Sequence, residues 1–201
     1  MNGKDAWPTP DSALVVVDVQ NDFCPGGALA VPEGDAVVPV VNAWVRRFRA
    51  AGRPVVYTQD WHPPGHCSFA ERGGPWPPHC VQGTQGAALV AGLDVDGIRV
   101  LKGFEPDHDA YSGFDGFVAA PDGTPSATPL ATWLREHGVR SVLVVGLATD
   151  YCVQATALDA LRLGFRVAVD PDGCRAVDVS PGDGQRALDR MAEAGASLLG
   201  R

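Results

Sequence analysis

The 201-residue sequence is poor in lysine, in positive charge overall and in long apolar runs. Its formal net charge of −8 argues against a nucleic-acid or anionic-membrane partner, because both bind through basic patches. No apolar run reaches the roughly 18 residues that a membrane-spanning helix needs. The first residues lack the charged and then apolar pattern of a secretory signal. We therefore expect a cytoplasmic chain, and the sequence leaves open whether it forms a homo-oligomer.

Cysteine is also used sparingly, and the pattern excludes two common roles. The five cysteines are widely spaced and odd in number, which disfavours a disulfide framework, and no CxxC pair suggests a thiolate zinc site. Most of them should be small buried side chains, and one could be a nucleophile. Lysine is rarer still, because 14 of the 16 basic residues are arginine and only Lys4 and Lys102 are lysine.

Val-rich runs alternate with helical patterns along the chain, and this alternation predicts an α/β fold. Apolar runs of four to seven residues between turn residues are typical of strands buried on both faces of a parallel sheet. We predict one domain over residues 1–201, a three-layer sandwich whose six-stranded, mostly parallel sheet carries helices on both faces. Residues 1–11 should be a short frayed lead. The predicted strands end at Asp18 or cover 54–58, 98–102, 141–146, 165–170 and 196–199.

Four helices are expected between these strands. The first covers about 35–51, and the second begins with Thr128 as N-cap and Pro129 as its first residue. The third covers about 150–163, and the last begins at Ser180 and ends near Gly195. Residues 61–86 and 103–127 show little periodicity. Irregular segments of this length inside a compact domain are usually functional or disordered, and the Trp and His content of the first favours function.

Chemically active side chains stand at the ends of four predicted strands. They are Asp18, Asp60 with His62, Lys102 and Cys152. Ligands of an open parallel sheet bind outside the carboxyl ends of its strands. One site could therefore gather an acid, an ammonium, a thiol and a metal-binding cluster, which is the outline of a hydrolase.

Three of the five histidines and one aspartate lie within twenty residues, and they form a candidate metal site. The four residues are Asp60, His62, His66 and His79. Imidazole nitrogens with one carboxylate suit Zn(II), Fe(II) or Mn(II). The alternative is that these are ordinary solvated histidines of a surface loop. Cys67 and Cys80 each directly follow a candidate histidine, so both neighbours can hardly point at one ion, and we leave them out of the site.

Cys152 is the candidate nucleophile because it lies just inside a predicted helix start. Unpaired backbone N–H groups and the positive end of the helix dipole should lower its pKa and could hold an oxyanion. Lys102 should favour the thiolate as well, so we expect alkylation near pH 6, whereas Asp18 opposes this unless it holds the proton itself. The alternatives are a buried helix-face cysteine, a turn residue at position 18 and a lysine that only extends its charge to solvent.

Six short motifs carry a resemblance to a known family. They are V-D-V-Q-N-D-F-C, Q-D-W-H, W-P-P-H-C, L-K-G, A-Y-S-G-F and G-L-A-T-D-Y-C. The chain resembles the nicotinamidases of the isochorismatase-like cysteine hydrolase superfamily from about Ala13 to Leu199. The resemblance implies the fold of that superfamily and hydrolysis of nicotinamide to nicotinate and ammonia, with pyrazinamide as a further substrate. Rival readings are a hydrolase of N-carbamoyl compounds and a non-catalytic metal-binding protein.

The resemblance also implies roles for single residues. The triad would be Asp18, Lys102 and Cys152. One divalent ion would bind Asp60, His62, His66 and His79 and hold the pyridine nitrogen of the substrate. A cis peptide would fall at Leu147–Ala148, with the backbone N–H groups of Ala148 and Cys152 forming the oxyanion hole. The substrate pocket would contain Phe23, Trp76, Leu147 and Tyr111. Tyr151 departs from the family, because many relatives carry His before the cysteine.

Overall fold

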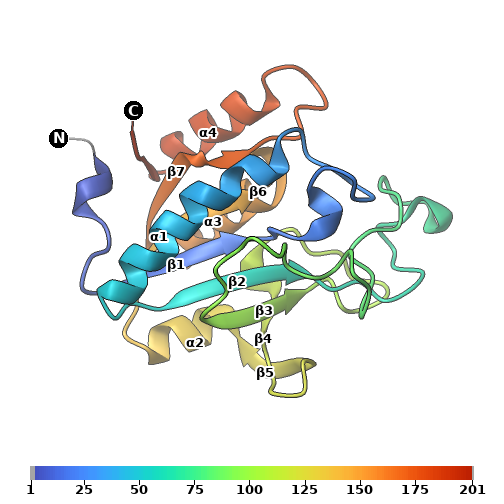
Figure 1. Ribbon diagram of the computed structural model, residues 1–201, viewed down its shortest axis with the longest axis horizontal. Helices are drawn as coiled ribbons and strands as arrows, with labels where there is room; N and C mark the ends of the chain where they lie inside the picture. The colour runs from blue at the N-terminus through green and yellow to red at the C-terminus, as the bar shows by residue number, and fades with distance from the viewer. Residues whose placement is uncertain (1–2, 201) are drawn as a thin grey trace.

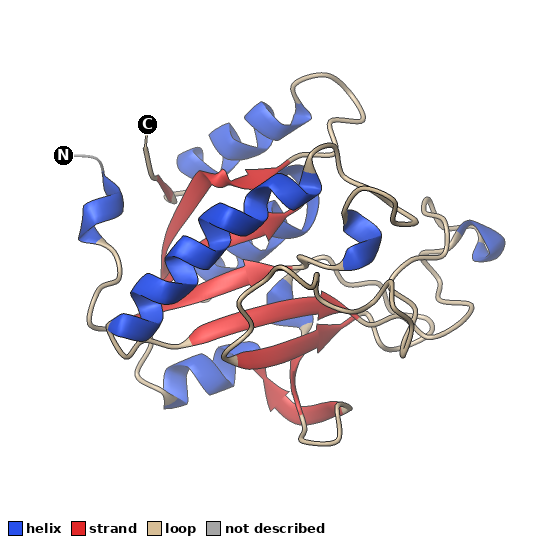
Figure 2. Cartoon of the chain, viewed as in Figure 1, coloured by secondary structure: helices blue, strands red, loops and turns tan. Residues whose placement is uncertain are grey.

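The computed structural model describes residues 3–200, which fold around one eight-stranded sheet (Figures 1 and 2). The strand order is β5-β4-β3-β2-β1-β6-β7-β8. The strands are β1 (Ser12–Val17), β2 (Val55–Asp60), β3 (Ile98–Lys102), β4 (Phe117–Ala119), β5 (Pro125–Pro129), β6 (Ser141–Leu147), β7 (Arg166–Arg175) and β8 (Ser197–Leu198). Six neighbouring strands of this order are parallel, and they are the six that the sequence predicts: β3, β2, β1, β6, β7 and β8.

The expectation of six strands is corrected by two short antiparallel strands at one edge. β4 pairs with β3, and β5 pairs with β4. The predicted irregular segment 103–127 contains β4 and the start of β5, whose half-exposed side chains do not show the apolar run of a buried strand. Thr128 and Pro129 do not open a helix, because Pro129 pairs with Phe117 in extended backbone and is itself the N-cap of α2.

Helices cover both faces of the sheet, as predicted. They are α1 (Val38–Ala50), α2 (Leu130–Glu136), α3 (Gln154–Arg162) and α4 (Asp183–Glu193). Figure 1 shows α1 in front of the central strands, and its buried side chains share a core with alternate residues of β1, Leu14 and Val16. The other alternate residues, such as Val15, pack with α2, α3 and α4 on the opposite face. Because both faces of β1 are covered, all of its residues are buried.

The other three helices also begin later than the sequence predicts. α1 follows a 3-10 turn, η3 (Gly34–Val37), and α3 follows a wider π-type turn, η6 (Thr149–Val153). α4 begins at Asp183, with Gly182 as N-cap. The carboxylate of Asp183 accepts a hydrogen bond of 2.8 Å from the backbone N–H of Ser180, which is the reach-back contact of a capping box. The Ser-Pro-Gly-Asp signal therefore locates the helix start correctly to within three residues.

The described part of the N-terminal lead is attached to the sheet and is not frayed; residues 1–2 lie outside the described residues. Residues 3–6 form a 3-10 helix, η1 (Gly3–Ala6). Lys4 Nζ lies 2.8 Å from Asp170 of β7 and 2.7 Å from Asp172, and Trp7 packs against the core on the α1 face. Across residues 3–200, no helix combines the length and apolar character needed to cross a membrane.

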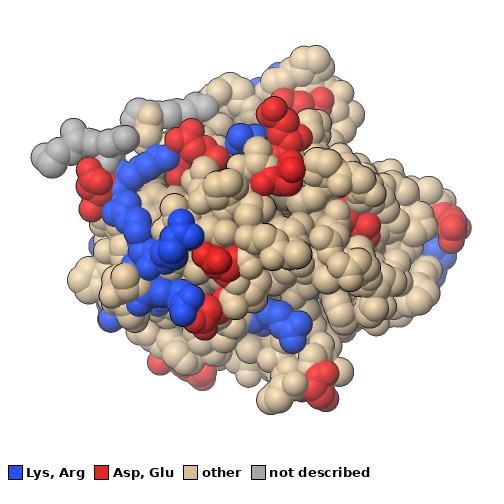
Figure 3. Space-filling view, viewed as in Figure 1, with Lys and Arg blue, Asp and Glu red and all other residues tan. Residues whose placement is uncertain are grey.

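On the face shown in Figure 3, basic side chains gather over one end and acidic side chains border them. Among the arginines of α1, Arg46 Nη1 lies 3.1 Å from Asp94, and Arg49 forms an ion pair with Asp96. Arg47 instead donates to two backbone carbonyls of the N-terminal lead. Two of the three arginines of α1 are therefore paired with carboxylates, and the third is bonded to the backbone.

Candidate active site

The candidate catalytic residues meet at the carboxyl ends of four adjacent strands. Asp18 follows β1, Asp60 and Lys102 end β2 and β3, and Cys152 lies in η6 after β6. β1 and β6 are neighbours in the sheet although about 125 residues of sequence separate them, and the chain switches sides of the sheet between them. Such a switch point is where open parallel sheets bind ligands. All four side chains are buried.

Asp18 is held in one orientation by the neighbouring strand. Its backbone has a φ of 48°, which turns the chain sharply at the end of β1. Thr58 Oγ1 donates a hydrogen bond of 2.6 Å to Asp18 Oδ1. Oδ2 has no hydrogen-bond donor among the described residues, although Lys102 Nζ lies 3.0 Å away. Burial raises the pKa of Asp18, against the influence of Lys102, so Oδ2 is the oxygen able to accept a proton.

Lys102 is the central cation of the site. Its Nζ is fully buried and contacts Asp18, forms a short ion pair with Asp60 Oδ1, and lies 3.5 Å from Cys152 Sγ. The Ala110 carbonyl accepts a further hydrogen bond of 3.2 Å from the same ammonium. Burial alone would lower the pKa of Lys102, but the two carboxylates raise it well above its ordinary value. The side chain is therefore a cation in the resting protein and does not extend to solvent.

The environment of Cys152 corrects the expectation of a lowered thiol pKa. Burial raises the pKa of Cys152 well above its ordinary value, and Asp18 and Asp60 raise it further, whereas Lys102 lowers it. The sequence locates the helix start and the lysine but does not show that the thiol is enclosed beside two carboxylates. The resting nucleophile is consequently a thiol that needs a base. One oxygen each of Asp18 and Asp60 lies within 4.8 Å of Cys152 Sγ.

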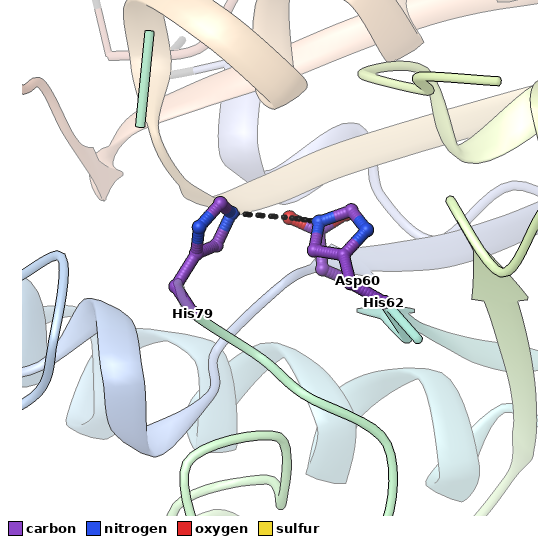
Figure 4. A group of neighbouring side chains, drawn as sticks. All are labelled: Asp60, His62 and His79. Carbon is purple, nitrogen blue, oxygen red and sulfur yellow. Dashed lines mark ion pairs between the residues drawn. The ribbon is translucent and has the colours of Figure 1, made fainter. Parts of the chain in front are cut away.

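Asp60, His62 and His79 form a compact donor cluster beside the triad (Figure 4). Asp60 Oδ2 lies 3.7 Å from His62 Nε2 and 3.9 Å from His79 Nε2. Each Nδ1 faces a backbone carbonyl at 2.8 Å, that of Gly103 for His62 and that of Pro77 for His79. A carbonyl only accepts, so each Nδ1 carries a hydrogen and each Nε2 faces Asp60. Burial would lower the pKa of His62, but Asp60 raises it above its ordinary value, so a metal ion would compete with a proton for His62 Nε2.

These three donors fit a divalent metal ion. Two imidazole nitrogens and a carboxylate oxygen lie within 4.8 Å of one another, and their Nδ1 groups have the outer hydrogen bonds that usually orient metal-ligating histidines. Burial lowers the pKa of His79, which keeps its ring in the neutral form that a metal binds. The two oxygens of Asp60 have different partners: Oδ1 forms the ion pair with Lys102, and Oδ2 faces the two histidines.

His66, the fourth expected metal ligand, is not brought into this cluster. Its ring stacks on His62 with a centroid distance of 4.2 Å. Its Nε2 lies 3.0 Å from the His108 carbonyl and its Nδ1 lies 2.8 Å from Ser68 Oγ. In this arrangement both ring nitrogens have protein partners, so binding an ion would require the ring to give up the bond to His108.

A small pocket, partly open to solvent, leads to Cys152. Its lining includes Asp60, His79 and Cys152. The structure also places on its wall the four side chains expected for the substrate pocket, which are Phe23, Trp76, Leu147 and Tyr111. The lining is mostly apolar, with a few polar groups at the buried end, which is typical of a small-molecule site.

Three aromatic rings from separate segments meet at this pocket. Trp76 Nε1 donates a hydrogen bond of 3.0 Å to Tyr111 Oη, which joins the two irregular segments. Tyr151 contacts both, with ring centroids 5.2 Å from Trp76 and 6.0 Å from Tyr111. Tyr151, the residue that departs from the family pattern, therefore forms part of the pocket wall next to the nucleophile.

The peptide bond between Leu147 and Ala148 is cis in the structure. Ala148 and Cys152 both line the pocket, one on each side of the first turn of η6. The Ala148 carbonyl accepts hydrogen bonds of 3.1 Å from the backbone N–H groups of Tyr151 and Val153. Ala148, the second residue expected to form an oxyanion hole, thus lies in the same pocket wall as Cys152.

Sequence reasoning missed four residues that support the site. Thr58 and Ala110 contact Asp18 and Lys102, as described above. Gln20 binds the backbone of Asp60 twice, donating to its carbonyl at 2.8 Å and accepting from its N–H at 2.9 Å. Gly103 accepts from His62. A signal did exist for both Gln20 and Thr58: Thr58 is a polar residue within the apolar strand β2, and Gln20 stands two residues after Asp18 in V-D-V-Q-N-D-F-C, and both side chains are fully buried.

Comparison with known proteins identifies the family to which the chain belongs. The isochorismatase domain model matches residues 12–201, and the chain belongs to the isochorismatase family. Within the family it is similar to nicotinamidases: a nicotinamidase of Escherichia coli is 44% identical over 94% of both chains. A zinc complex of a Pyrococcus horikoshii pyrazinamidase superposes with a TM-score of 0.85 and 48% identity, covering 96% of this chain and 100% of the other. A nicotinate complex from L. infantum gives 0.80 and 40%, covering 94% and 91%.

Proposed function

We propose that the chain hydrolyses nicotinamide to nicotinate and ammonia through a thioester on Cys152. The observation that carries the proposal is one buried lysine that contacts both a carboxylate and a thiol at the end of an aromatic-walled pocket. Its Nζ lies 3.0 Å from Asp18 Oδ2 and 3.5 Å from Cys152 Sγ. Relatives named nicotinamidase and a relative bound to nicotinate support the choice of amide.

The first half of the reaction forms the thioester. Asp18 Oδ2 accepts the proton of Cys152, and the sulfur attacks the amide carbon as the carbonyl oxygen becomes an oxyanion. Burial raises the pKa of both groups, so the Asp18 carboxylate is a stronger base than an exposed one, while Lys102 opposes the rise at Cys152 and stabilises the thiolate that forms. Backbone N–H groups of Ala148 and Cys152 stabilise the oxyanion. Asp18 then returns the proton to the nitrogen, the C–N bond breaks and ammonia leaves.

The second half releases the acid. Asp18, again a carboxylate, accepts a proton from a water molecule that attacks the thioester carbon, and the C–S bond breaks to leave nicotinate. The sulfur regains the proton from Asp18, which restores the resting thiol. Lys102 remains charged throughout and stabilises whichever partner is negative, the carboxylate or the sulfur.

We propose that Asp60, His62 and His79 hold one divalent ion, zinc, iron or manganese, and that His66 completes the site by rotating away from His108. When bound, the ion supplies a Lewis-acid position for the lone pair of the pyridine nitrogen. Phe23, Trp76, Leu147 and Tyr111 enclose the ring and orient it. The donor set of the cluster and the zinc-bound relative support this assignment.

Ammonia release from nicotinamide, with and without a chelator, tests the proposal. The wild-type protein should release ammonia, Cys152→Ala should release none, and benzamide, which lacks the ring nitrogen, should be a much poorer substrate. A chelator should reduce turnover of nicotinamide. Hydrolysis of an N-carbamoyl compound in place of nicotinamide would point to a sister hydrolase, and metal binding without any amide hydrolysis would point to a non-catalytic protein.

The proposal also includes expectations about location and partners. The chain would work in the cytoplasm and would need no nucleic acid. Light scattering after size-exclusion chromatography would show whether it forms a homo-oligomer. Pyrazinamide should be a second substrate, because its ring also has a nitrogen meta to the amide.

A further inference from the structure

The glycine that follows the catalytic lysine has an unusual environment. Gly103 accepts a hydrogen bond of 2.8 Å from His62 Nδ1, and its φ is +59°. A Cβ at this position would lie 2.5 Å from Cε1 and 2.7 Å from Nδ1 of the His62 ring. Real Cβ atoms essentially never come so close to another atom. The imidazole therefore occupies the space that any other residue at position 103 would fill.

The hydrogen bond determines which nitrogen of His62 is available. The Gly103 carbonyl can only accept, so Nδ1 carries a hydrogen, and Nε2, which lies 3.7 Å from Asp60 Oδ2, is the nitrogen left to bind a metal ion. The second nitrogen of a ligating histidine normally has such a partner, which sets both the tautomer and the direction of the ring. His62 is buried, so few other positions are open to its ring.

We propose that Gly103 is a positioning residue that holds His62 in its metal-binding orientation. It acts in two ways: its carbonyl fixes the tautomer, and its missing side chain lets the ring stack directly over the backbone. The inference rests on the proposed metal cluster. It also gives the Lys102–Gly103 pair a joint role, because consecutive residues then serve the thiol through Nζ and the metal cluster through a carbonyl.

A matched control exists elsewhere in the chain. Gly138, at the end of α2, has a similar φ of +72°, but a Cβ added there meets no atom within 4 Å. Ala at this position would carry the same kind of backbone strain without touching a ligand. Comparing Gly103→Ala with Gly138→Ala therefore separates the contact with His62 from the general cost of an alanine in the left-handed region.

The experiment is a titration of metal-depleted protein with Co²⁺, followed by calorimetry and by the visible d–d absorption of bound cobalt. Gly103→Ala should bind Co²⁺ about 10-fold to 100-fold more weakly and change the absorption spectrum, as loss of an outer partner of a metal ligand generally does. Gly138→Ala should match the wild type in both readouts. Equal affinity and spectrum for Gly103→Ala and the wild type would overturn the proposal. A wild type that binds no Co²⁺ would instead contradict the metal site itself.

A double variant shows whether Gly103 acts through the ring. In a His62→Ala background the clash is absent, so adding Gly103→Ala should lower the free energy of unfolding of the metal-depleted protein, measured by urea denaturation, no more than Gly138→Ala does, whereas the loss should be larger when His62 is present. The same loss in both backgrounds would mean that Gly103 acts through backbone strain, against the proposal. If Gly103→Ala alone fails to fold, the double variant should fold again because the collision is removed, and a double variant that also fails to fold would contradict the proposal.

Discussion

The only two lysines of this chain do similar electrostatic work in two different regions, and they differ in what surrounds them. Lys4 bridges Asp170 and Asp172, and Lys102 bridges Asp18 and Asp60. The Lys4 side chain is 22% exposed and one of its partners is 74% exposed, whereas Lys102 is fully buried. The first arrangement attaches a terminal segment to the sheet. The second holds two buried carboxylates beside a thiol.

The comparison also shows how much depends on the second partner of each aspartate. Asp170 is fully buried like Asp18, but both of its oxygens accept hydrogen bonds, Oδ2 from Trp44 Nε1 at 2.7 Å and Oδ1 from the backbone N–H of Asp172 at 3.3 Å, in addition to the contact with Lys4. Asp18 accepts a comparable bond from Thr58 on Oδ1 alone, and its Oδ2 has only the ammonium of Lys102 among the described residues. A carboxylate with donors on both oxygens is a structural anchor, and one with a single oxygen so bonded can take up a proton on the other.

Replacing Lys102 should produce the largest effect. Lys102→Met leaves Asp18 and Asp60 buried without their cation, so the free energy of unfolding should fall by about 3–5 kcal/mol and nicotinamide turnover should be lost. Urea denaturation and an ammonia assay measure the two effects. A decrease of less than about 1 kcal/mol would show that the buried Lys102 and the partly exposed Lys4 contribute equally to stability.

The metal cluster should respond unequally to loss of its histidines. His62→Ala removes a donor that already faces Asp60, so metal content and nicotinamide turnover should both be lost. His66→Ala removes a ring that is bonded to His108, and we expect a smaller decrease in metal affinity. Metal analysis of the purified variants and a Co²⁺ titration give the order. Equal losses would mean that His66 is as fully a ligand as His62.

Asp170→Asn should destabilise the protein without affecting catalysis. The substitution removes the negative charge that Lys4 and Trp44 Nε1 share, which should lower the free energy of unfolding by about 1–3 kcal/mol. Turnover should stay within about 2-fold of the wild type because Asp170 does not line the pocket. Thermal unfolding and the ammonia assay test both statements, and a large loss of turnover would show that the two regions are coupled.

Lys4→Met should have the smallest effect, below about 1 kcal/mol, because Lys4 is partly exposed and its partner Asp172 is 74% exposed, so solvent screens this pair. Although burial would lower the pKa of Lys4, Asp170 and Asp172 raise it above 10.5. Stability from a raised lysine pKa is complete below pH 10.5 and is lost as the pH rises through the folded-state value. The difference between variant and wild type should therefore shrink as the pH rises beyond 10.5 in urea titrations. A difference that grows with pH would contradict this assignment.

Local patterns in the sequence account for the parallel part of the fold and for which residues stand at the strand ends. The apolar runs before Asp18, Lys102 and Cys152 predict buried strands, and they can be recognised without knowing which distant residues they contact. Edge strands β4 and β5 were not predicted, because their exposed side chains lack such a pattern. The predictions failed where a property depends on several segments together.

The site shows the same division. The raised pKa of Cys152 depends on carboxylates from β1 and β2 and on burial, none of which is visible near position 152. The position of His66 depends on the carbonyl of His108, in another irregular segment. Trp76 and Tyr111 were expected at the pocket from family resemblance, since periodicity in their segments is weak. Gly103 could not be found from the sequence, because its role is defined by the space that a ring fills.

The order of the site residues along the chain sets the order in which they become available during synthesis. The chain lays down β1 to β5 from the middle toward one edge, and only then adds β6, β7 and β8 on the other side. Asp18, the three clustered metal donors and Lys102 all precede residue 103, whereas Cys152 emerges about fifty residues later. A ribosome-bound chain that ends before β6 thus carries the carboxylate of Asp18, the ammonium of Lys102 and the three clustered donors, but not the thiol. Of the side chains that contact Lys102 Nζ, Cys152 is the last to be synthesised.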